Sequence, residues 1–388
     1  MTNLMRMRND LIWRMAPRLM LDHYQCHDDK AVGNGRKDLP KIGIFREFTG
    51  LHRQYVAAAE QMGVSFKVVN IMSAGWIDAV RNSGCDLFFV WPSPLGPAWK
   101  NMFDERLKIV VEELDKNVYP RLDEIWLWES KRRMNYWLEA KGIRRPQTWV
   151  FYDLDEARTF ADTASLPLIF KPDFGDCAKG IKVIRTRAQA RAWATRGFRA
   201  GDRFGGHPGD RSWGCVIFQQ FIPNAREWRV IRVGDSLFAY RKGKVGDFHS
   251  GSKLVEFDTP PESVLDLMIE VCDRGRFDCM SIDVLEDENG NFYVTELQSL
   301  FGGDPWDFQM AIAGVPGRYL VEGGAPRVGR YKFERGVFCE NNCANLRIRD
   351  GFRKYYNLDT GFWEQPGDLG RCLELAQTKF RYLISSGL

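Results

Sequence analysis

Three oxygen-bearing side chains lie on one predicted β-hairpin in the last third of the chain. Residues 280–286 and 292–298 are two apolar runs joined by a turn that contains an Asn-Gly pair, so we expect them to pair as antiparallel strands. Alternate residues of a strand share a face, so Glu296 and Gln298 lie together, with Asp283 roughly opposite. Two carboxylates and a carboxamide suit a hard cation such as Mg²⁺, which can bridge phosphate oxygens. The alternative is the solvated outer face of a surface hairpin.

A second segment, residues 168–186, combines lysines with glycines. Lys171 interrupts a strand of buried type and is followed by a loop with Gly175 and Gly180, and then by another strand. Two strands joined by such a loop can cover an anion, because backbone N–H groups and ammonium groups both donate to it. Phosphate is the expected anion. The segment is not a P-loop, since no helix follows it, and a plain hairpin with a solvated Lys179 is the alternative.

A third segment places a carboxylate beside a guanidinium. In the strand-like run 226–233, Glu227 and Arg229 share one face, while Trp228 lies on the other. The chain then crosses a Val-Gly-Asp turn into a second alternating strand. The Gly-, Asp- and Arg-rich stretch 201–214 that precedes this pair of strands predicts a loop.

The elements that must position these residues fall into successive units. Strands alternating with helices over 40–120 predict a parallel α/β domain, after an extension formed by 1–39. The Lys171 segment belongs to a unit spanning 121–220, and the Asp283 hairpin to one spanning 221–325. The remainder, 326–388, is expected to pack as a tail on the catalytic body. The fold class is therefore α/β, with an α+β catalytic part.

The order of these motifs resembles the ATP-grasp superfamily, most closely its ligases that join a carboxylate to an amine. Among these it is similar to the ribosomal-protein glutamate ligases and the D-alanyl-D-alanine ligases. The resemblance covers residues 121–305, and the unit 40–120 matches the α/β domain that usually precedes such a fold. It implies an ATP-grasp fold preceded by a parallel α/β pre-ATP-grasp domain, with ATP and Mg²⁺ as cofactors.

The resemblance also implies roles for individual side chains. Asp283, Glu296 and Gln298 occupy the positions of the magnesium ligands. Arg229 and Arg241 match arginines that approach the γ-phosphate or the acyl group. The residues that match nucleotide-binding positions are Lys131, Lys171, Gly175, Lys179, Gly180, Gln219, Gln220, Ile222 and Glu227.

Three departures from the family pattern leave the substrate open. Gln298 replaces the usual Asn on a longer arm. Ser281 stands where the D-alanyl-D-alanine ligases place an arginine, which leaves oxyanion stabilisation to the two arginines above. The stretch 246–253 looks like the substrate loop of the glutamate ligases without its Arg and Asn, and its His249 is either a base for the attacking amine or a solvated loop residue.

The activity that the resemblance implies is ADP-forming synthesis of an amide or peptide bond through an acyl phosphate. The substrates would be a small-molecule or peptide carboxylate and an amine. The alternatives are a kinase or a carboxylate–thiol ligase on the same scaffold, or a nucleotide-binding protein without catalysis. Alignment and charge neutralisation would carry such catalysis, so no Ser-His-Asp or Cys-His set is required.

Composition limits the remaining possibilities. The 388 residues, 44% of them hydrophobic, suffice for two or three domains, and a net charge of +4 calls for no nucleic-acid partner. Nine cysteines without a paired CxxC indicate reduced thiols and a cytoplasmic protein. The clusters at 23–27 and 339–343 lack partner pairs at zinc-site spacing, so we expect ordinary side chains there.

The first 21 residues carry four arginines among apolar residues, so they form neither a signal peptide nor a membrane-length run. We expect an amphipathic helix that packs on the protein itself, with an anionic membrane surface as the alternative. A homo-oligomer is possible, and no transmembrane segment is expected.

Overall fold

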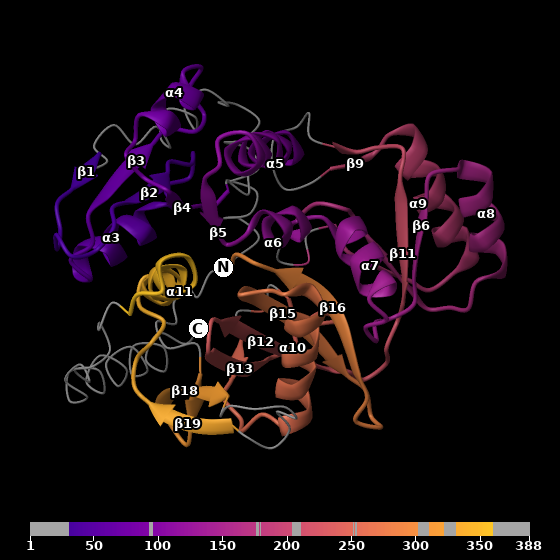
Figure 1. Cartoon of the computed structure of the whole chain (residues 1–388). Coiled ribbons are helices and arrows are strands. Elements are labelled where there is room, and N and C mark those ends of the chain that lie inside the picture. Colours follow the sequence, from indigo (N-terminus) through magenta and orange to yellow (C-terminus); the bar gives the residue numbers. More distant parts are fainter. Residues whose placement is uncertain are drawn as a thin grey trace, which may run out of the picture.

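The computed structural model describes residues 31–92, 96–175, 178, 180–203, 211–250, 252, 254–301, 310–321 and 331–359. Its first unit is a five-stranded sheet in the order β1-β3-β2-β4-β5 (Figure 1). The last four of these strands run parallel, which confirms the predicted parallel α/β domain, and β1 pairs antiparallel with β3. The elements are β1 (Val32–Gly33), β2 (Ile42–Phe45), α3 (Arg53–Gln61), β3 (Phe66–Val69), α4 (Trp76–Arg81), β4 (Leu87–Phe89), α5 (Pro97–Glu112) and β5 (Asn117–Tyr119).

The second unit is a small lobe built on an antiparallel sheet in the order β6-β11-β7-β8. One apolar cluster joins this sheet to α8 and α9 and includes Phe170, Ala190 and Phe218. In Figure 1 the lobe stands to one side of the molecule. Its elements and those leading into it are α6 (Leu122–Leu127), α7 (Lys131–Ala140), β6 (Thr148–Phe151), α8 (Leu154–Thr163), β7 (Leu168–Lys171), β8 (Lys182–Ile184), α9 (Arg187–Arg199), β9 (Asp202–Arg203), β10 (Arg211–Ser212) and β11 (Val216–Gln220).

The third unit is an eight-stranded sheet whose path is β16-β15-β12-β13-β18-β17, with β14 on β13 and β19 on β18. α10 covers one face, onto which Trp228 and Val230 of β12 pack. The opposite face carries the site described below. The elements are β12 (Arg226–Val233), β13 (Ser236–Lys242), β14 (Val255–Glu256), α10 (Glu262–Gly275), β15 (Cys279–Glu286), β16 (Phe292–Gln298), β17 (Ala311–Ile312), β18 (Val315–Val321), β19 (Tyr331–Arg335) and α11 (Ala344–Tyr356).

The two ends of the described chain join these units more closely than the predicted boundaries suggest. β1 lies within the predicted extension 1–39 but belongs to the first sheet, and β19 of the predicted tail extends the large sheet. α11 packs against α3, β4 and β5 of the first unit and against β12 of the large sheet. The predicted N-terminal amphipathic helix lies outside the described residues, as does the part of the predicted tail beyond residue 359.

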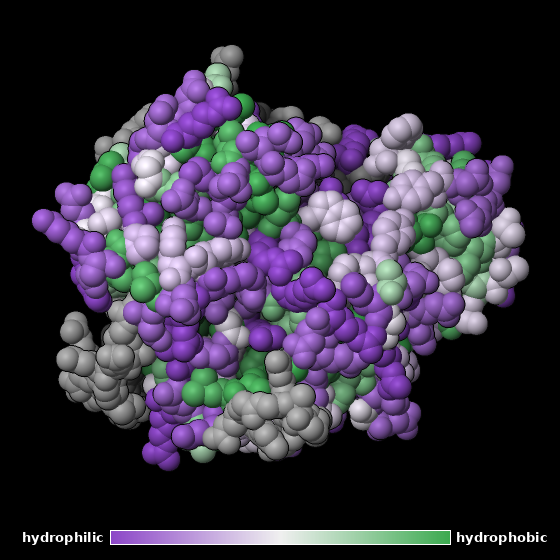
Figure 2. Space-filling model, in the orientation of Figure 1, coloured by the Kyte–Doolittle hydropathy of each residue, from purple (hydrophilic) through white to green (hydrophobic). Residues whose placement is uncertain are grey.

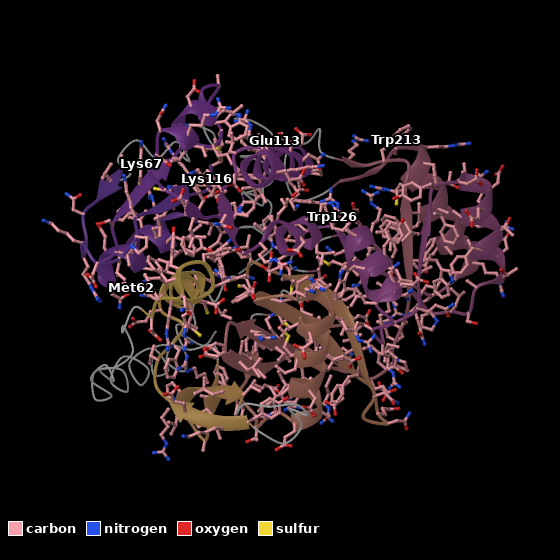
Figure 3. All side chains as sticks on the ribbon, in the orientation of Figure 1. Met62, Lys67, Glu113, Lys116, Trp126 and Trp213 are labelled. Carbon is pink, nitrogen blue, oxygen red and sulfur yellow. The ribbon has the colours of Figure 1, made fainter. Side chains whose placement is uncertain are left out.

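The surface in view is mostly hydrophilic, with smaller apolar areas between (Figure 2). Exposed aromatic side chains include Trp126 of α6 and Trp213 beside β10, both labelled in Figure 3. None of the helices in the described ranges is both long enough and apolar enough to cross a membrane.

Candidate active site

The predicted hairpin forms and brings its acidic residues together. β15 and β16 pair antiparallel with Asp283 directly opposite Glu296, and the register shifts just after this pair. Gln298 donates its side-chain N–H to Glu296 Oε2 at 3.2 Å, so these two side chains share a face. The hairpin and its polar face are therefore confirmed, and metal binding by these side chains stays a prediction.

Two cations on neighbouring strands neutralise Asp283. Arg229 on β12 donates to Oδ1 at 2.8 Å and to Oδ2 at 2.9 Å, and Lys242 on β13 donates to Oδ2 at 2.5 Å. Burial alone would raise the pKa of Asp283, but these two cations hold it well below its ordinary value. Asp283 is therefore an ionised, nearly fully buried carboxylate.

Lys242 also reaches the predicted ribose-binding residue. Its Nζ lies 2.6 Å from Glu227 Oε1, to which Ser250 Oγ donates at 3.3 Å. His249 Nδ1 lies 3.7 Å from Glu227 Oε2. Burial lowers the pKa of His249 despite this carboxylate, so the imidazole is neutral at pH 7.

No role was predicted for Lys242 from the sequence, although the strand register places it on the face of the site. The tight turn after Val233 pairs that residue with Ser236. Counting away from the turn along both strands pairs Glu227 with Lys242. Paired residues of an antiparallel sheet lie on the same face, so Lys242 shares the face of Glu227.

Arg241 is the predicted catalytic residue that the structure does not bring into this cluster. It is paired with Trp228, on the α10 side of the sheet, and its guanidinium lies 5.9 Å from the Trp228 ring centroid. It forms ion pairs with Glu256 and Asp258. Its neighbour Lys242 occupies the site face instead, because adjacent residues of a strand point to opposite sides.

This placement gives a prediction for two adjacent cations. We expect Arg241→Ala to keep ATP turnover within about threefold of wild type, as for a surface ion pair outside the site. Lys242→Ala should lower turnover at least about 100-fold, because it removes a cation from the face where the phosphates are expected. ADP release at saturating ATP measures both, with melting curves as the folding control. Equal losses in the two variants would contradict the assignment of faces.

The N-terminus of α7 places Lys131 at the glycine loop. Ser130 caps the helix, and the Asp173 carboxylate accepts bonds from Ser130 Oγ at 3.1 Å and from the Arg132 backbone N–H at 2.9 Å. Lys131 Nζ then donates to the Gly175 carbonyl at 2.6 Å and lies 4.0 Å from Glu296 Oε1. Lys131 therefore connects the small lobe to the acidic hairpin.

Lys171 ends β7 as a partly buried cation among these groups. Burial lowers its pKa, an effect opposed chiefly by the negative charge of Glu296. After it, Gly175 and Gly180 have φ values of 122° and 79°, which favour glycine. Lys179 lies outside the described residues, and its predicted role stays a prediction.

The predicted adenine-binding residues end β11. Gln219 donates its side-chain N–H to Thr148 Oγ1 at 2.9 Å, and the Gln220 backbone N–H donates to the Gln147 carbonyl at 2.7 Å. The Gln220 backbone therefore has its carbonyl, not its N–H, to offer to a base.

Both lobes contribute to a single pocket. Lys131 and Lys171 line an adjoining hollow, to which α7, the small-lobe sheet and β16 all contribute. The predicted site residues that line the pocket itself are Lys171, Gln219, Gln220, Ile222, Glu227, His249, Asp283 and Glu296.

A metal at this site would need ligands beyond the protein's acids. In the described part of the chain, no group of three His, Cys, Asp or Glu side chains could hold a metal ion. Cys339 and Cys343 are both buried free thiols. The cluster at 23–27 lies outside the described residues.

Comparison with solved structures shows the fold. The chain superposes on the ADP complex of an N5-carboxyaminoimidazole ribonucleotide synthetase with a TM-score of 0.52 and 13% identity, over 72% of this chain and 74% of that one. The Staphylococcus aureus N5-carboxyaminoimidazole synthetase complexed with ADP gives 0.51 and 13%, over 70% and 73%. The biotin carboxylase domain of the Hydrogenobacter thermophilus 2-oxoglutarate carboxylase, with MgADP and bicarbonate, gives 0.50 and 14%, over 71% and 66%.

These neighbours are ATP-grasp enzymes, and the chain has the ATP-grasp fold preceded by a parallel α/β domain. At such low identity the likeness concerns the fold alone. No protein-family model matches the sequence, and no curated protein matches it.

Proposed function

We propose that this protein is an ATP-dependent ligase that joins a carboxylate to an amine and releases ADP and phosphate. The observation that carries the proposal is the convergence of cations and carboxylates from both lobes on one pocket of an ATP-grasp fold. Lys131 and Lys171 bring positive charge to this acidic cluster from the small lobe, which suits an anionic nucleotide. Lys131, Lys171, Arg229 and Lys242 face Glu227, Asp283 and Glu296.

ATP would lie between the lobes. The Gln220 carbonyl and the Ile222 backbone at the end of β11 would bind adenine, and Glu227 would bind ribose. Lys131 and Lys171 would hold the phosphates from the small lobe, because a buried lysine binds an anion strongly in a site of low dielectric. The glycine loop would cover the phosphates and exclude water.

The residues present fit Mg²⁺ as a partner of the nucleotide. Asp283 and Glu296 face each other, and Gln298 can turn its carboxamide oxygen toward them. Three hydrogen bonds occupy the Asp283 carboxylate, which leaves one of its roughly four acceptor positions for a metal. When bound with the phosphates, Mg²⁺ would neutralise charge on the transferring phosphoryl group.

The reaction would proceed in two steps that the chain's own cations assist. A carboxylate oxygen of the substrate attacks the γ-phosphorus, the bond to the bridging oxygen breaks, and ADP leaves. The amine nitrogen then attacks the acyl carbon, loses a proton, and phosphate leaves. Arg229 and Lys242 face the region where negative charge develops, and the neutral His249 imidazole is a candidate acceptor for the proton of the amine.

The proposal is tested by ADP release from wild-type protein with pools of amino acids and other carboxylates, followed by mass spectrometry of the products. We expect release that requires both an acid and an amine, and a product that has lost one water relative to them. Hydroxylamine in place of the amine should give a hydroxamate, which is diagnostic of an acyl phosphate or another activated acyl group.

Other outcomes would replace the proposal with a different function. Phosphorylation of a hydroxyl acceptor without hydroxamate would indicate a kinase, and a thioester product would indicate a carboxylate–thiol ligase. Nucleotide binding without any acceptor-dependent turnover would indicate a binding protein.

A further inference from the structure

Arg347 of α11 is a fully buried cation that has no carboxylate partner among the described residues. Its exposure is 0%, its Nε donates to Cys279 Sγ at 3.3 Å, and its Nη1 donates to the Asn342 carbonyl at 3.2 Å. Nη2 has no hydrogen-bond partner. The ionisable groups that interact with its charge are the thiols of Cys279 and Cys343 and the Tyr55 hydroxyl. Burial raises the pKa of Cys279 to about 12, so that thiol is not an anion at pH 7.

A second buried arginine, Arg318, has a carboxylate partner and can be compared with Arg347. Arg318 is 4% exposed and lies 4.2 Å from the Phe338 ring centroid, so it too stacks on an aromatic ring. It donates from Nε to Glu334 at 2.7 Å and from Nη1 to Ser236 Oγ at 2.7 Å. Arg347 has the same kind of stacking but lacks the carboxylate, and an unpaired buried charge destabilises a fold.

The contacts of Arg347 join three separate parts of the molecule. Its guanidinium lies 4.9 Å from the ring centroid of Trp91, just beyond β4 of the first unit, and 4.5 Å from that of Phe301. Phe301 follows β16, which carries Glu296. Cys279 begins β15, on which Asp283 follows four residues later. One side chain therefore touches both outer ends of the acidic hairpin and attaches them to the first domain.

Only a planar cation can make this set of contacts. A guanidinium stacks on rings through its faces while its N–H groups donate in its plane, whereas an ammonium is a point charge and a thioether is neither cation nor donor. Replacement of Arg347 by methionine would fill similar space and remove the unpaired charge, but it would release the hairpin from Trp91.

We propose that Arg347 is a positioning residue for the acidic hairpin. Its guanidinium, held by Trp91, Phe301 and Cys279, fixes β15 and β16 against the first domain. The fold retains this buried charge although it lowers stability. The proposal rests on the function proposed above, because the hairpin's purpose there is to hold Mg²⁺ with the nucleotide. Arg347 would act on the predicted metal ligands indirectly, through the two strands that carry Asp283 and Glu296.

The test compares the full-length wild type with Arg347→Met, Arg347→Lys and the matched control Arg318→Met. Thermal melting is the first readout. We expect Arg347→Met to melt at or above the wild-type temperature, since a buried charge becomes an apolar side chain. Arg318→Met should melt several degrees lower, because it leaves the buried Ser236 hydroxyl without its donor and also removes the bond to Glu334.

Binding of a fluorescent ATP analogue, titrated with Mg²⁺, is the second readout. In Arg347→Met and Arg347→Lys, the Mg²⁺ concentration at half-maximal enhancement of binding should rise roughly tenfold. Metal-free nucleotide affinity should stay within about twofold of wild type, because residues far from Arg347 would hold the adenosine. Arg318→Met should keep the wild-type Mg²⁺ dependence.

Three results would overturn the proposal. In the first, Arg347→Met melts at a temperature as low as that of Arg318→Met. In the second, the Mg²⁺ midpoint of Arg347→Met equals that of wild type. In the third, Arg347→Lys has the wild-type Mg²⁺ midpoint. A wild-type protein that binds no nucleotide at all would instead refute the proposed function and this inference with it. If the wild type binds nucleotide and Arg347→Met shows the same Mg²⁺ dependence, only this inference is refuted.

Discussion

Replacing Lys171 with alanine is expected to lower ATP turnover by about 100- to 1000-fold or more, while the protein stays folded. Lys171 is partly buried between the lobes, where its charge interacts with Glu296 and Asp283. A cation in such a site stabilises the transferring phosphoryl group far more than it would in water. Folding should survive, because burial already disfavours this charge and lowers the pKa of Lys171. Glu296→Ala should abolish turnover likewise, by removing an acid from the predicted metal site.

ADP release at saturating ATP measures this effect, and melting temperature monitors folding. Lys182→Ala is the matched control, since Lys182 lies on the paired strand β8 but is exposed to solvent. It should retain nearly full turnover. Normal turnover in Lys171→Ala or in Glu296→Ala would contradict the assignment of this pocket as the nucleotide site.

Asp283→Ala is expected to reduce the free energy of unfolding by about 3–5 kcal/mol as well as abolish turnover. The carboxylate accepts bonds from Arg229 and Lys242, and its loss leaves two partly buried cations, of which Lys242 keeps its bond to Glu227. Denaturant unfolding of the variant and of wild type measures the difference. Asp78→Ala, which removes an exposed acid from α4, should change stability by about 0.5 kcal/mol or less.

A double variant separates the charge effect from the loss of packing. Adding Lys242→Met to Asp283→Ala removes one of the uncompensated cations, so part of the lost stability should return while turnover stays absent. Strictly additive losses would show that Lys242 and Asp283 are not coupled, contrary to their 2.5 Å contact.

The ion pairs of Asp283 with Arg229 and Lys242 predict how the stability of the protein changes with pH. The folded-state pKa of Asp283 lies below its ordinary value of 3.8, so its contribution to stability is fully present above that pH and is lost as the pH falls below it. The stability gap between wild type and Asp283→Ala should therefore be constant from pH 5 to pH 7 and shrink below about pH 4. A gap that grew on acidification would contradict the ionised state of Asp283.

Local rules were enough to predict the elements that carry the site. The Asn-Gly turn and the alternation of 280–286 and 292–298 predicted the hairpin that places Asp283 opposite Glu296. The strand ending at Lys171 was predicted from a similar pattern. These features depend on neighbours in sequence, through turn chemistry and the two-residue repeat of a strand. By contrast, α10 was not anticipated, although Val264, Met268 and Cys272 mark its buried face.

The sequence by itself thus determined the acidic hairpin, the lysine strand and the order of units that lead to an ATP-grasp fold, because each is encoded over a few adjacent residues. Only the tertiary structure decided that Lys242 rather than Arg241 meets Asp283, since that choice depends on strand register across the sheet. It also decided that Arg347 bonds Cys279 from 68 positions away. Contacts of this kind depend on how separate elements pack, and no pattern within either segment specifies its partner.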